Sequence, residues 1–210
     1  SMRAFIVDDE PLARIELKRL LRQFPEITVS GEAANVDEAV ESINDQRPDI
    51  LFLDIHLPGR NGFELLEALD HVPTVIFTTA YNEYALKAFE VSALDYLLKP
   101  VDPKRLATAI RKVMELRGRQ KSTDESSRLN QIDQIFLRDG ERCWFVKVQN
   151  IRLLESEGNY SKLYFDTYKP LILRSLNYLE ERLDPKMFFR TSRKQIINLK
   201  WVEGIETGYD

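Results

Sequence analysis

Four short apolar runs in the first half of the chain place strict limits on its fold. They lie at residues 4–7, 50–53, 75–77 and 96–98, and each has the length of one buried strand. Helix-like stretches alternate with the strand-like runs through this half. This alternation predicts repeated βαβ units and therefore an open parallel sheet packed against helices.

Reactive side chains follow each run closely. They are Asp8 and Asp9, Asp54, Thr79 and Lys99. Because ligands of open parallel sheets bind just beyond the carboxyl ends of the strands, we expect these groups to converge at one edge. Clustered carboxylates repel one another unless a cation lies among them, and a hard cation with oxygen ligands, best matched by Mg²⁺, suits the place. An aspartate nucleophile, Mg²⁺ and a lysine together favour phosphoryl transfer to the aspartate.

Four motifs in this half carry a family resemblance: VDDEP, LDIHLPGRNG, TTAY and DYLLKP. In this order and spacing, residues 3 to about 118 resemble the receiver domain of a two-component response regulator. The resemblance implies an α/β, flavodoxin-like fold, which is a doubly wound parallel sheet of five strands. We therefore assign residues 1–118 to a receiver domain.

The same resemblance implies roles for the residues at the strand ends. It makes Asp54 the phosphoacceptor, and it makes Asp8, Asp9, Asp54 and the backbone carbonyl of His56 the Mg²⁺ ligands, with Asp8 acting mainly through water. Thr79 and Tyr96 fall on the switch hydroxyl and the switch aromatic, and Lys99 would pair with the phosphoryl group. Plainer readings exist, since Asp8 and Asp9 could cap the helix that Pro11 opens and Lys99 could be surface charge. The register of all four motifs favours the phosphoryl reading, and the bond between Lys99 and Pro100 is a candidate for the cis form.

The helices of this half are expected at residues 11–22, 36–46, about 63–69, 83–89 and 103–117. Residues 119–133 are polar and almost without apolar side chains, which is typical of a linker between domains.

The composition fits a soluble globular protein of one or two domains, with 43% hydrophobic residues and a net charge of −4. No apolar run is long enough for a membrane span, so no membrane association is expected. The single cysteine, Cys143, excludes an internal disulfide, fits a cytoplasmic location, and is expected in the core beside Trp144 and Phe145. The first half is acidic and the second mildly basic, which permits contact with nucleic acid.

Residues 134–210 change to a pattern of short strands. A hairpin is expected around the Asp139-Gly140 pair, and further strands at 151–155, 162–165 and 171–173. Ser175 can cap a helix whose apolar positions are three and four residues apart. This half is therefore predicted to be mostly β, with one clear helix.

Three stretches of this half, LLESEGNYSKLYF, ILRSLNYLEERL and FFRTSRKQIINLKWVEGIE, resemble the LytTR-type DNA-binding domain. That family binds DNA through loops placed in neighbouring major grooves. The resemblance implies DNA contacts by Ser161, Lys162, Arg193 and Lys194. Arg190 could equally brace the domain, and Asn198 is expected to be a structural turn residue. The family pattern continues with two more strands, so we expect the domain to be incomplete at Asp210, with weakened DNA binding.

The two resemblances together predict a transcription factor of the two-component type, not an enzyme that turns over substrate. A sensor histidine kinase would phosphorylate Asp54 in a Mg²⁺-dependent reaction, and phosphorylation would control binding to promoter DNA through a homodimer. Two alternatives remain open from the sequence. One is an Asp-nucleophile phosphatase, which usually has a second acid where this chain has His56. The other is a signalling adaptor whose C-terminal half binds protein.

Overall fold

The computed structural model describes residues 1–80, 95–119, 134–140 and 142–208. These residues form two compact units, one built from 1–119 together with 142–145, the other from 134–140 and 146–208. The helix expected at 83–89 and nearly all of the expected linker lie outside the described residues. Within the ranges given above, no helix is long and apolar enough to cross a lipid bilayer.

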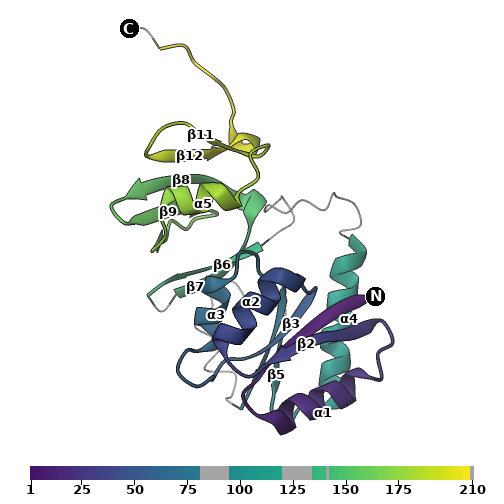
Figure 1. The fold of residues 1–210 in the computed structure, drawn as a ribbon. Helices are drawn as coiled ribbons and strands as arrows, with labels where there is room; N and C mark the ends of the chain where they lie inside the picture. The colour runs from purple at the N-terminus through teal and green to yellow at the C-terminus, as the bar shows by residue number, and fades with distance from the viewer. Residues whose placement is uncertain (81–94, 120–133, 141, 209–210) are drawn as a thin grey trace. The chain divides into compact units, whose positions relative to one another are not determined.

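The first unit is a five-stranded parallel sheet with helices on both faces (Figure 1). Its strands are β1 (Met2–Val7), β2 (Ile27–Ala33), β3 (Ile50–Asp54), β4 (Thr74–Thr79) and β5 (Asp95–Leu98). Its described helices are α1 (Pro11–Leu21), α2 (Val36–Gln46), α3 (Gly62–Ala68) and α4 (Pro103–Arg119). The strand order is β2-β1-β3-β4-β5, which confirms the predicted flavodoxin-like sheet.

Local signals in the sequence set the helix boundaries. Pro11 occupies the first turn of α1, where its missing N–H costs nothing. The side chains of Asn35 and Asn61 cap α2 and α3, and each accepts a hydrogen bond of 3.0 Å from a backbone N–H three residues on. Helix α2 ends where Arg47 takes a left-handed conformation with φ of 48°, directly before a proline.

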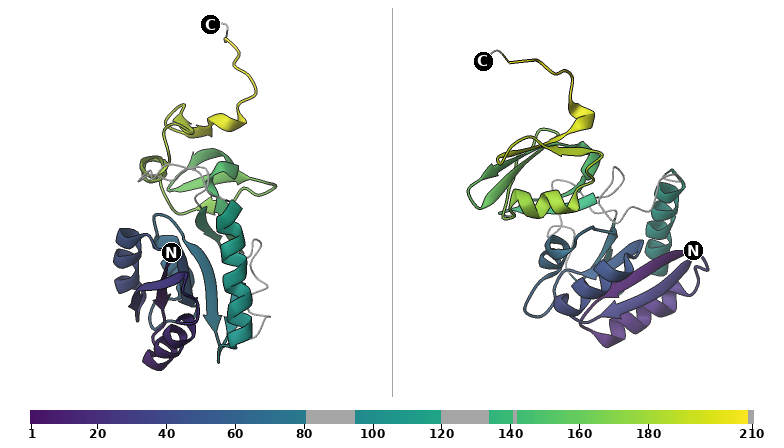
Figure 2. Two further views of the ribbon diagram at one scale, coloured as in Figure 1. Left: turned by 90° about the vertical axis from the view of Figure 1, so that its right-hand side faces the viewer. Right: turned by 45° about the horizontal axis from the view of Figure 1, so that its top comes forward.

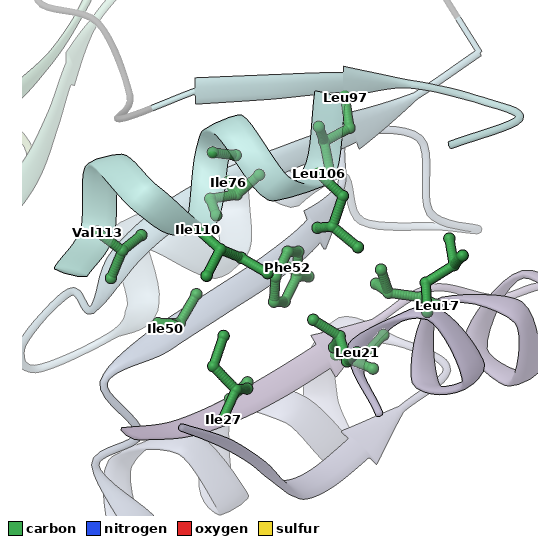
Figure 3. Close-up of a cluster of buried hydrophobic side chains, with 14 of the residues drawn as sticks. Leu17, Leu21, Ile27, Ile50, Phe52, Ile76, Leu97, Leu106, Ile110 and Val113 are labelled. Atoms are coloured by element: carbon green, nitrogen blue, oxygen red, sulfur yellow. The ribbon is translucent and has the colours of Figure 1, made fainter. Parts of the chain in front are cut away.

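The core of the first unit lies between the sheet and two helices. Figure 3 shows side chains of α1 and α4 meeting those of β2, β3, β4 and β5. The residues labelled there are Leu17, Leu21, Ile27, Ile50, Phe52, Ile76, Leu97, Leu106, Ile110 and Val113. Burial of each such side chain is worth about 1.5–3 kcal/mol. Helices α2 and α3 lie on the opposite face of the sheet from α4 (Figure 2, left). The sheet is therefore covered on both faces, and only its edges and strand ends can carry a site.

The second unit and the hairpin before it are mostly β. The strands are β6 (Gln134–Asp139), β7 (Arg142–Lys147), β8 (Ile151–Glu157), β9 (Tyr160–Phe165), β10 (Leu171–Ile172), β11 (Phe188–Arg190) and β12 (Gln195–Asn198). Strands β6 and β7 pair with each other, and the other five form a sheet in the order β10-β9-β8-β12-β11. Helix α5 (Leu176–Arg182) begins at Ser175, whose side chain accepts a hydrogen bond of 3.1 Å from the N–H of Tyr178. The predicted mostly-β architecture, the cap and the burial of Cys143 are confirmed.

The β8–β9 hairpin is longer than the sequence indicated. Strand β8 continues to Glu157 and β9 starts at Tyr160, because Gly158 has a positive φ of 64° and closes a tight turn. Ser161 therefore lies inside β9 and not in a loop, whereas Lys162 lies in the strand that the sequence predicted to begin there. In the first unit, the cis form expected for the bond between Lys99 and Pro100 is confirmed.

Candidate functional sites

The strand register of the first sheet brings the predicted site residues to one edge. Val7 lies beside Leu53 in the pairing of β1 with β3, so the next residues, Asp8 and Asp54, are neighbours. Asp54 in turn lies beside Thr78, one residue before Thr79. All of these positions are at the carboxyl ends of parallel strands, where ligands of open α/β sheets bind.

The ammonium group of Lys99 joins the two buried carboxylates. Its Nζ lies 2.8 Å from Oδ2 of Asp8 and 2.9 Å from Oδ2 of Asp54. The exposed fractions of the three side chains are 18% for Lys99, 5% for Asp8 and 6% for Asp54. Charges this well shielded from water interact strongly, so Lys99 holds the ends of β1, β3 and β5 in one arrangement.

The same surroundings shift two pKa values. Burial is the largest influence on Asp54 and raises its pKa, although Lys99 and the backbone N–H of His56 partly oppose the shift. Burial works against the charge of Lys99, but its hydrogen bonds to Asp8 and Asp54 outweigh burial and raise its pKa. Lys99 is therefore protonated at neutral pH, whereas burial disfavours the negative charge of Asp54.

The donors needed for a hard cation are present beside this lysine. Carboxylate oxygens of Asp8, Asp9 and Glu10 lie within 4.8 Å of one another, and the Asp54 carboxylate faces Asp8 across Lys99. Asp8 is buried, Asp9 is half-buried and Glu10 is exposed, so the group opens from the sheet edge towards water. Oxygen-only donors with an open side match the preference of Mg²⁺, which keeps several waters when bound.

Two neighbouring residues support the loops of this site. Arg14 donates a hydrogen bond of 2.5 Å to the backbone carbonyl of Asp8 and forms an ion pair of 3.1 Å with Glu32. Gly62 approaches so closely that an added Cβ would lie 2.8 Å from the backbone oxygen of Asp54. Sequence reasoning missed both residues, and it also missed Glu10, although the DDE triplet placed that acid next to the predicted ligands.

Thr79 lies on β4, which pairs with the strand that carries Asp54, and Tyr96 lies on β5, one strand further along the sheet. Thr79 is fully buried at the end of β4, and its carbonyl accepts a hydrogen bond of 2.8 Å from the N–H of Lys99. Tyr96 is half-buried on β5, with the guanidinium of Arg105 5.7 Å from the centre of its ring. Arg105 also forms an ion pair with Asp95, the residue before Tyr96. Both predicted switch residues therefore lie near the strand ends that carry the acidic site.

A different surface is formed by two turns of the second sheet. The β8–β9 turn lies at Gly158 and Asn159, after the pairing of Glu157 with Tyr160. The β11–β12 turn covers residues 191–194 and adjoins it, because the N–H of Ser156 donates a hydrogen bond of 2.8 Å to the carbonyl of Lys194. Strands β8 and β12 pair directly, so both turns belong to the same end of the sheet.

The predicted DNA-contacting residues are not all on this surface. Arg193 and Lys194 are exposed in the β11–β12 turn, as expected. Ser161 is 0% exposed, and its hydroxyl donates a hydrogen bond of 2.7 Å to the carbonyl of Arg174. Its prediction as a DNA contact is corrected here, since a buried side chain with an internal partner holds the sheet together. Lys162 is half-buried on the opposite face of β9 and lies 3.5 Å from Glu157.

Asn198 is a structural residue, as predicted. It is 1% exposed, and its side-chain amide donates hydrogen bonds to the carbonyls of Gln149 and Ile151 at 3.2 and 2.9 Å. Its side-chain oxygen accepts a hydrogen bond of 2.9 Å from the N–H of Lys200. The side chain thus satisfies three backbone groups and is not available to read a base.

Comparison with known proteins identifies a domain family for each half of the chain. The model of the response regulator receiver domain matches residues 4–111, and the model of the LytTr DNA-binding domain matches residues 141–210. The sensory transduction protein LytT of Enterococcus faecalis is 36% identical, and the LytT protein of Bacillus subtilis is 34% identical. Each match covers 100% of this chain and 88% of the relative.

The transcriptional regulatory protein LytR of Staphylococcus aureus is 34% identical with the same coverage. Among solved structures, the response regulatory domain of protein mrkE from Klebsiella pneumoniae is similar, with a TM-score of 0.51 and 31% identity. That match covers 57% of this chain and 100% of the other. The fold, the site at the strand ends and these relatives agree: this chain belongs to the two-component response regulators that join a receiver domain to a LytTR DNA-binding domain.

Proposed function

We propose that this protein is switched by phosphorylation of Asp54 and that the switch controls promoter binding by its C-terminal domain. The observation that carries this proposal is the position of Lys99, 2.9 Å from Asp54 and 2.8 Å from Asp8, beside a group of acidic oxygens. The proposed domains are a receiver at residues 1–118, a linker at 119–133 and a DNA-binding domain at 134–210. The proposed partners are a sensor histidine kinase, promoter DNA and a second copy of the chain. Because promoter DNA is one of them, we place the system in the cytoplasm.

The proposed reaction needs little more than alignment and charge neutralisation. A carboxylate oxygen of Asp54 forms a bond to phosphorus as the phosphorus–nitrogen bond of the phosphohistidine breaks, and the leaving imidazole takes a proton from solvent. The ammonium group of Lys99 moves from the free carboxylates to the oxygens of the phosphoryl group. Asp8, Asp9, Asp54 and the carbonyl of His56 would hold Mg²⁺, which supplies further positive charge at those oxygens. The chain holds its phosphoryl group instead of turning over substrate.

The signal then passes through Thr79 and Tyr96. The hydroxyl of Thr79 would move to the new phosphoryl oxygens, and the ring of Tyr96 would turn inward behind it. Inward movement of Tyr96 changes its contact with Arg105 and so alters the face made by β5 and α4. We propose that this changed face favours the homodimer.

The exposed turn at residues 191–194 is the proposed DNA-binding surface. Arg193 has the length and fork geometry to read a guanine edge in the major groove. Lys194, and Lys162 on the neighbouring hairpin, suit phosphate contacts. Ser161 is left out of this proposal because its side chain is buried.

The phosphorylation proposal is tested with acetyl phosphate as the donor. Intact mass should show one added phosphoryl group on the wild type in the presence of Mg²⁺, and none on Asp54→Ala or in EDTA. Equal labelling of the variant would contradict the assignment. Steady release of phosphate would instead support the phosphatase alternative.

The DNA proposal is tested by a salt titration with a duplex selected from a random library by the wild-type protein. Arg193→Ala should cost about 1–3 kcal/mol and relax the preference at one base position. Lys194→Ala or Lys162→Ala should weaken binding to all sequences and lower the salt slope by about one unit. A protein that selects no duplex, but is captured through this unit by another protein, would favour the adaptor alternative.

A further inference from the structure

One arginine of the second unit connects the β11–β12 turn to helix α5. Arg190 is the last residue of β11, and its side chain is 22% exposed. Its Nε donates a hydrogen bond of 2.7 Å to the carbonyl of Ser192, and one terminal nitrogen donates a hydrogen bond of 2.9 Å to the carbonyl of Arg193. Two consecutive carbonyls of the exposed turn are therefore held by one guanidinium.

The other terminal nitrogen of the same guanidinium points to α5. It donates hydrogen bonds of 3.0 Å to the side-chain oxygen of Asn177 and of 2.7 Å to a carboxylate oxygen of Glu180. Guanidinium is planar and rigid, so fixing one edge on α5 also fixes the direction of the other edge. The position of the turn is thereby set by a helix that does not itself belong to the turn.

This network attaches to α5 a turn that is otherwise held by its own strands and by the hydrogen bond from the N–H of Ser156 to the carbonyl of Lys194. Residues 191–194 are all exposed, and their own hydrogen bonds close the turn without attaching it to α5. The carbonyl of Arg193 is bound by Arg190, so the side chain of Arg193 projects from a restrained backbone. A preformed contact loop loses less conformational entropy on binding than a free one.

We propose that Arg190 is the positioning residue of the DNA-binding turn, and that Asn177 and Glu180 complete it from α5. This inference rests on the proposed DNA-binding function and deepens it. Arg190 holds the turn in place while Arg193 and Lys194 touch the nucleic acid. Glu180 thus favours binding to a polyanion although it carries a negative charge itself.

The sign of the Glu180 effect separates positioning from simple electrostatics. Removing an acidic side chain near DNA should tighten binding to any duplex, because repulsion from the phosphates falls. Removing the partner of Arg190 should weaken binding to the preferred duplex. Glu181 is the matched control, since it is the next residue of α5, is exposed, and takes no part in the network.

The experiment compares Glu180→Ala with Glu181→Ala in the full chain. The probe is the duplex selected from a random library, with a scrambled duplex beside it, and each is titrated with salt. We expect Glu180→Ala to lose about 5- to 150-fold in affinity for the selected duplex, the range of one good base contact, with an unchanged salt slope. Glu181→Ala should bind as tightly as the wild type or more tightly.

Two further measurements keep the inference falsifiable. Amide resonances of residues 192–194 should shift in Glu180→Ala and not in Glu181→Ala, without DNA present. In an Arg190→Lys background, which keeps the charge but not the fork geometry, Glu180→Ala should cost little more. If Glu180→Ala tightens binding as Glu181→Ala does, or leaves those resonances unchanged, positioning by Arg190 is wrong. If Arg193→Ala and Lys194→Ala both bind like the wild type, the DNA-binding turn itself is wrongly assigned.

Discussion

Replacing Lys99 by methionine removes the positive charge between Asp8 and Asp54 while keeping a side chain of similar length. Removing one partner of a buried ion pair typically costs 3–5 kcal/mol, because the remaining charge is left uncompensated. Lys99 is 18% exposed, so water can replace part of the lost interaction. We therefore expect a loss of about 2–4 kcal/mol in the free energy of unfolding of the first unit, measured in EDTA.

Mg²⁺ should restore part of this loss. A ligand that binds only the folded state at 100 times its Kd stabilises it by about 2.7 kcal/mol. The variant leaves its carboxylates with no positive charge between them, so its stability should depend on Mg²⁺ more strongly than that of the wild type. The gap between variant and wild type should therefore be larger in EDTA than in Mg²⁺.

The pH dependence has a definite sign. The carboxylates raise the pKa of Lys99 above its ordinary value of 10.5. Its contribution to stability is therefore complete below pH 10.5 and disappears as the pH rises through the folded-state pKa. On the alkaline side, the stability gap between wild type and variant should stay constant until strongly alkaline pH and then narrow; at acid pH it should narrow as the carboxylates that Lys99 binds become protonated.

Urea unfolding followed by a signal from the first unit measures these quantities. Lys104→Met, an exposed lysine at the start of α4, is the control and should change stability by less than about 0.5 kcal/mol. The reasoning would be refuted if Lys99→Met were as stable in EDTA as Lys104→Met. It would also be refuted if the difference in stability between the wild type and Lys99→Met increased at alkaline pH.

Three further changes have expected outcomes. Asp54→Asn should stabilise the metal-free protein at neutral pH, because burial raises the Asp54 pKa and so makes the charged carboxylate costly in the folded state. The gain, measured by urea unfolding, should vanish below pH 3.8, and a variant that is less stable than the wild type at pH 7 would contradict the prediction. Gly62→Ala should lower the free energy of unfolding by about 1–3 kcal/mol and slow labelling by acetyl phosphate, because the added Cβ would lie too close to the backbone of Asp54. Normal stability together with normal labelling would exclude that contact. Asn198→Ala should cost the second unit about 2–3 kcal/mol in urea, because it leaves buried backbone groups without partners, and a loss confined to DNA affinity would point to base reading instead.

The first unit could be predicted well because its signals reinforce one another. The four apolar runs all formed strands of one sheet, and the parallel register then had to bring Asp8, Asp54 and Lys99 together. Strand β2 was not among these runs, since its sequence ITVSGEA alternates apolar residues with Thr, Ser and Glu and it lies at the sheet edge. The support from Arg14 and the close approach of Gly62 are properties of the packed structure that no local pattern contains.

In the second unit, the family motif alone predicted a DNA contact at Ser161 that the alternation of buried and exposed residues along the strand argues against. Ser161 lies inside β9, where side chains alternate between the two faces, and it shares the buried face with Leu163 and Phe165. The apolar pair at 163 and 165 already indicated that residue 161 points inward. Arg190 could not be assigned from sequence, because its partners on α5 are 10 and 13 residues away and only folding brings them together.

The central claim is that phosphorylation of Asp54 controls DNA binding by the second domain. The most direct measurement is the affinity of the wild type and of Asp54→Ala for the selected duplex, before and after treatment with acetyl phosphate and Mg²⁺. The account predicts tighter binding after treatment for the wild type alone, together with a shift from monomer to dimer in sedimentation. Equal affinity before and after labelling of the wild type, or an equal gain by Asp54→Ala, would contradict it.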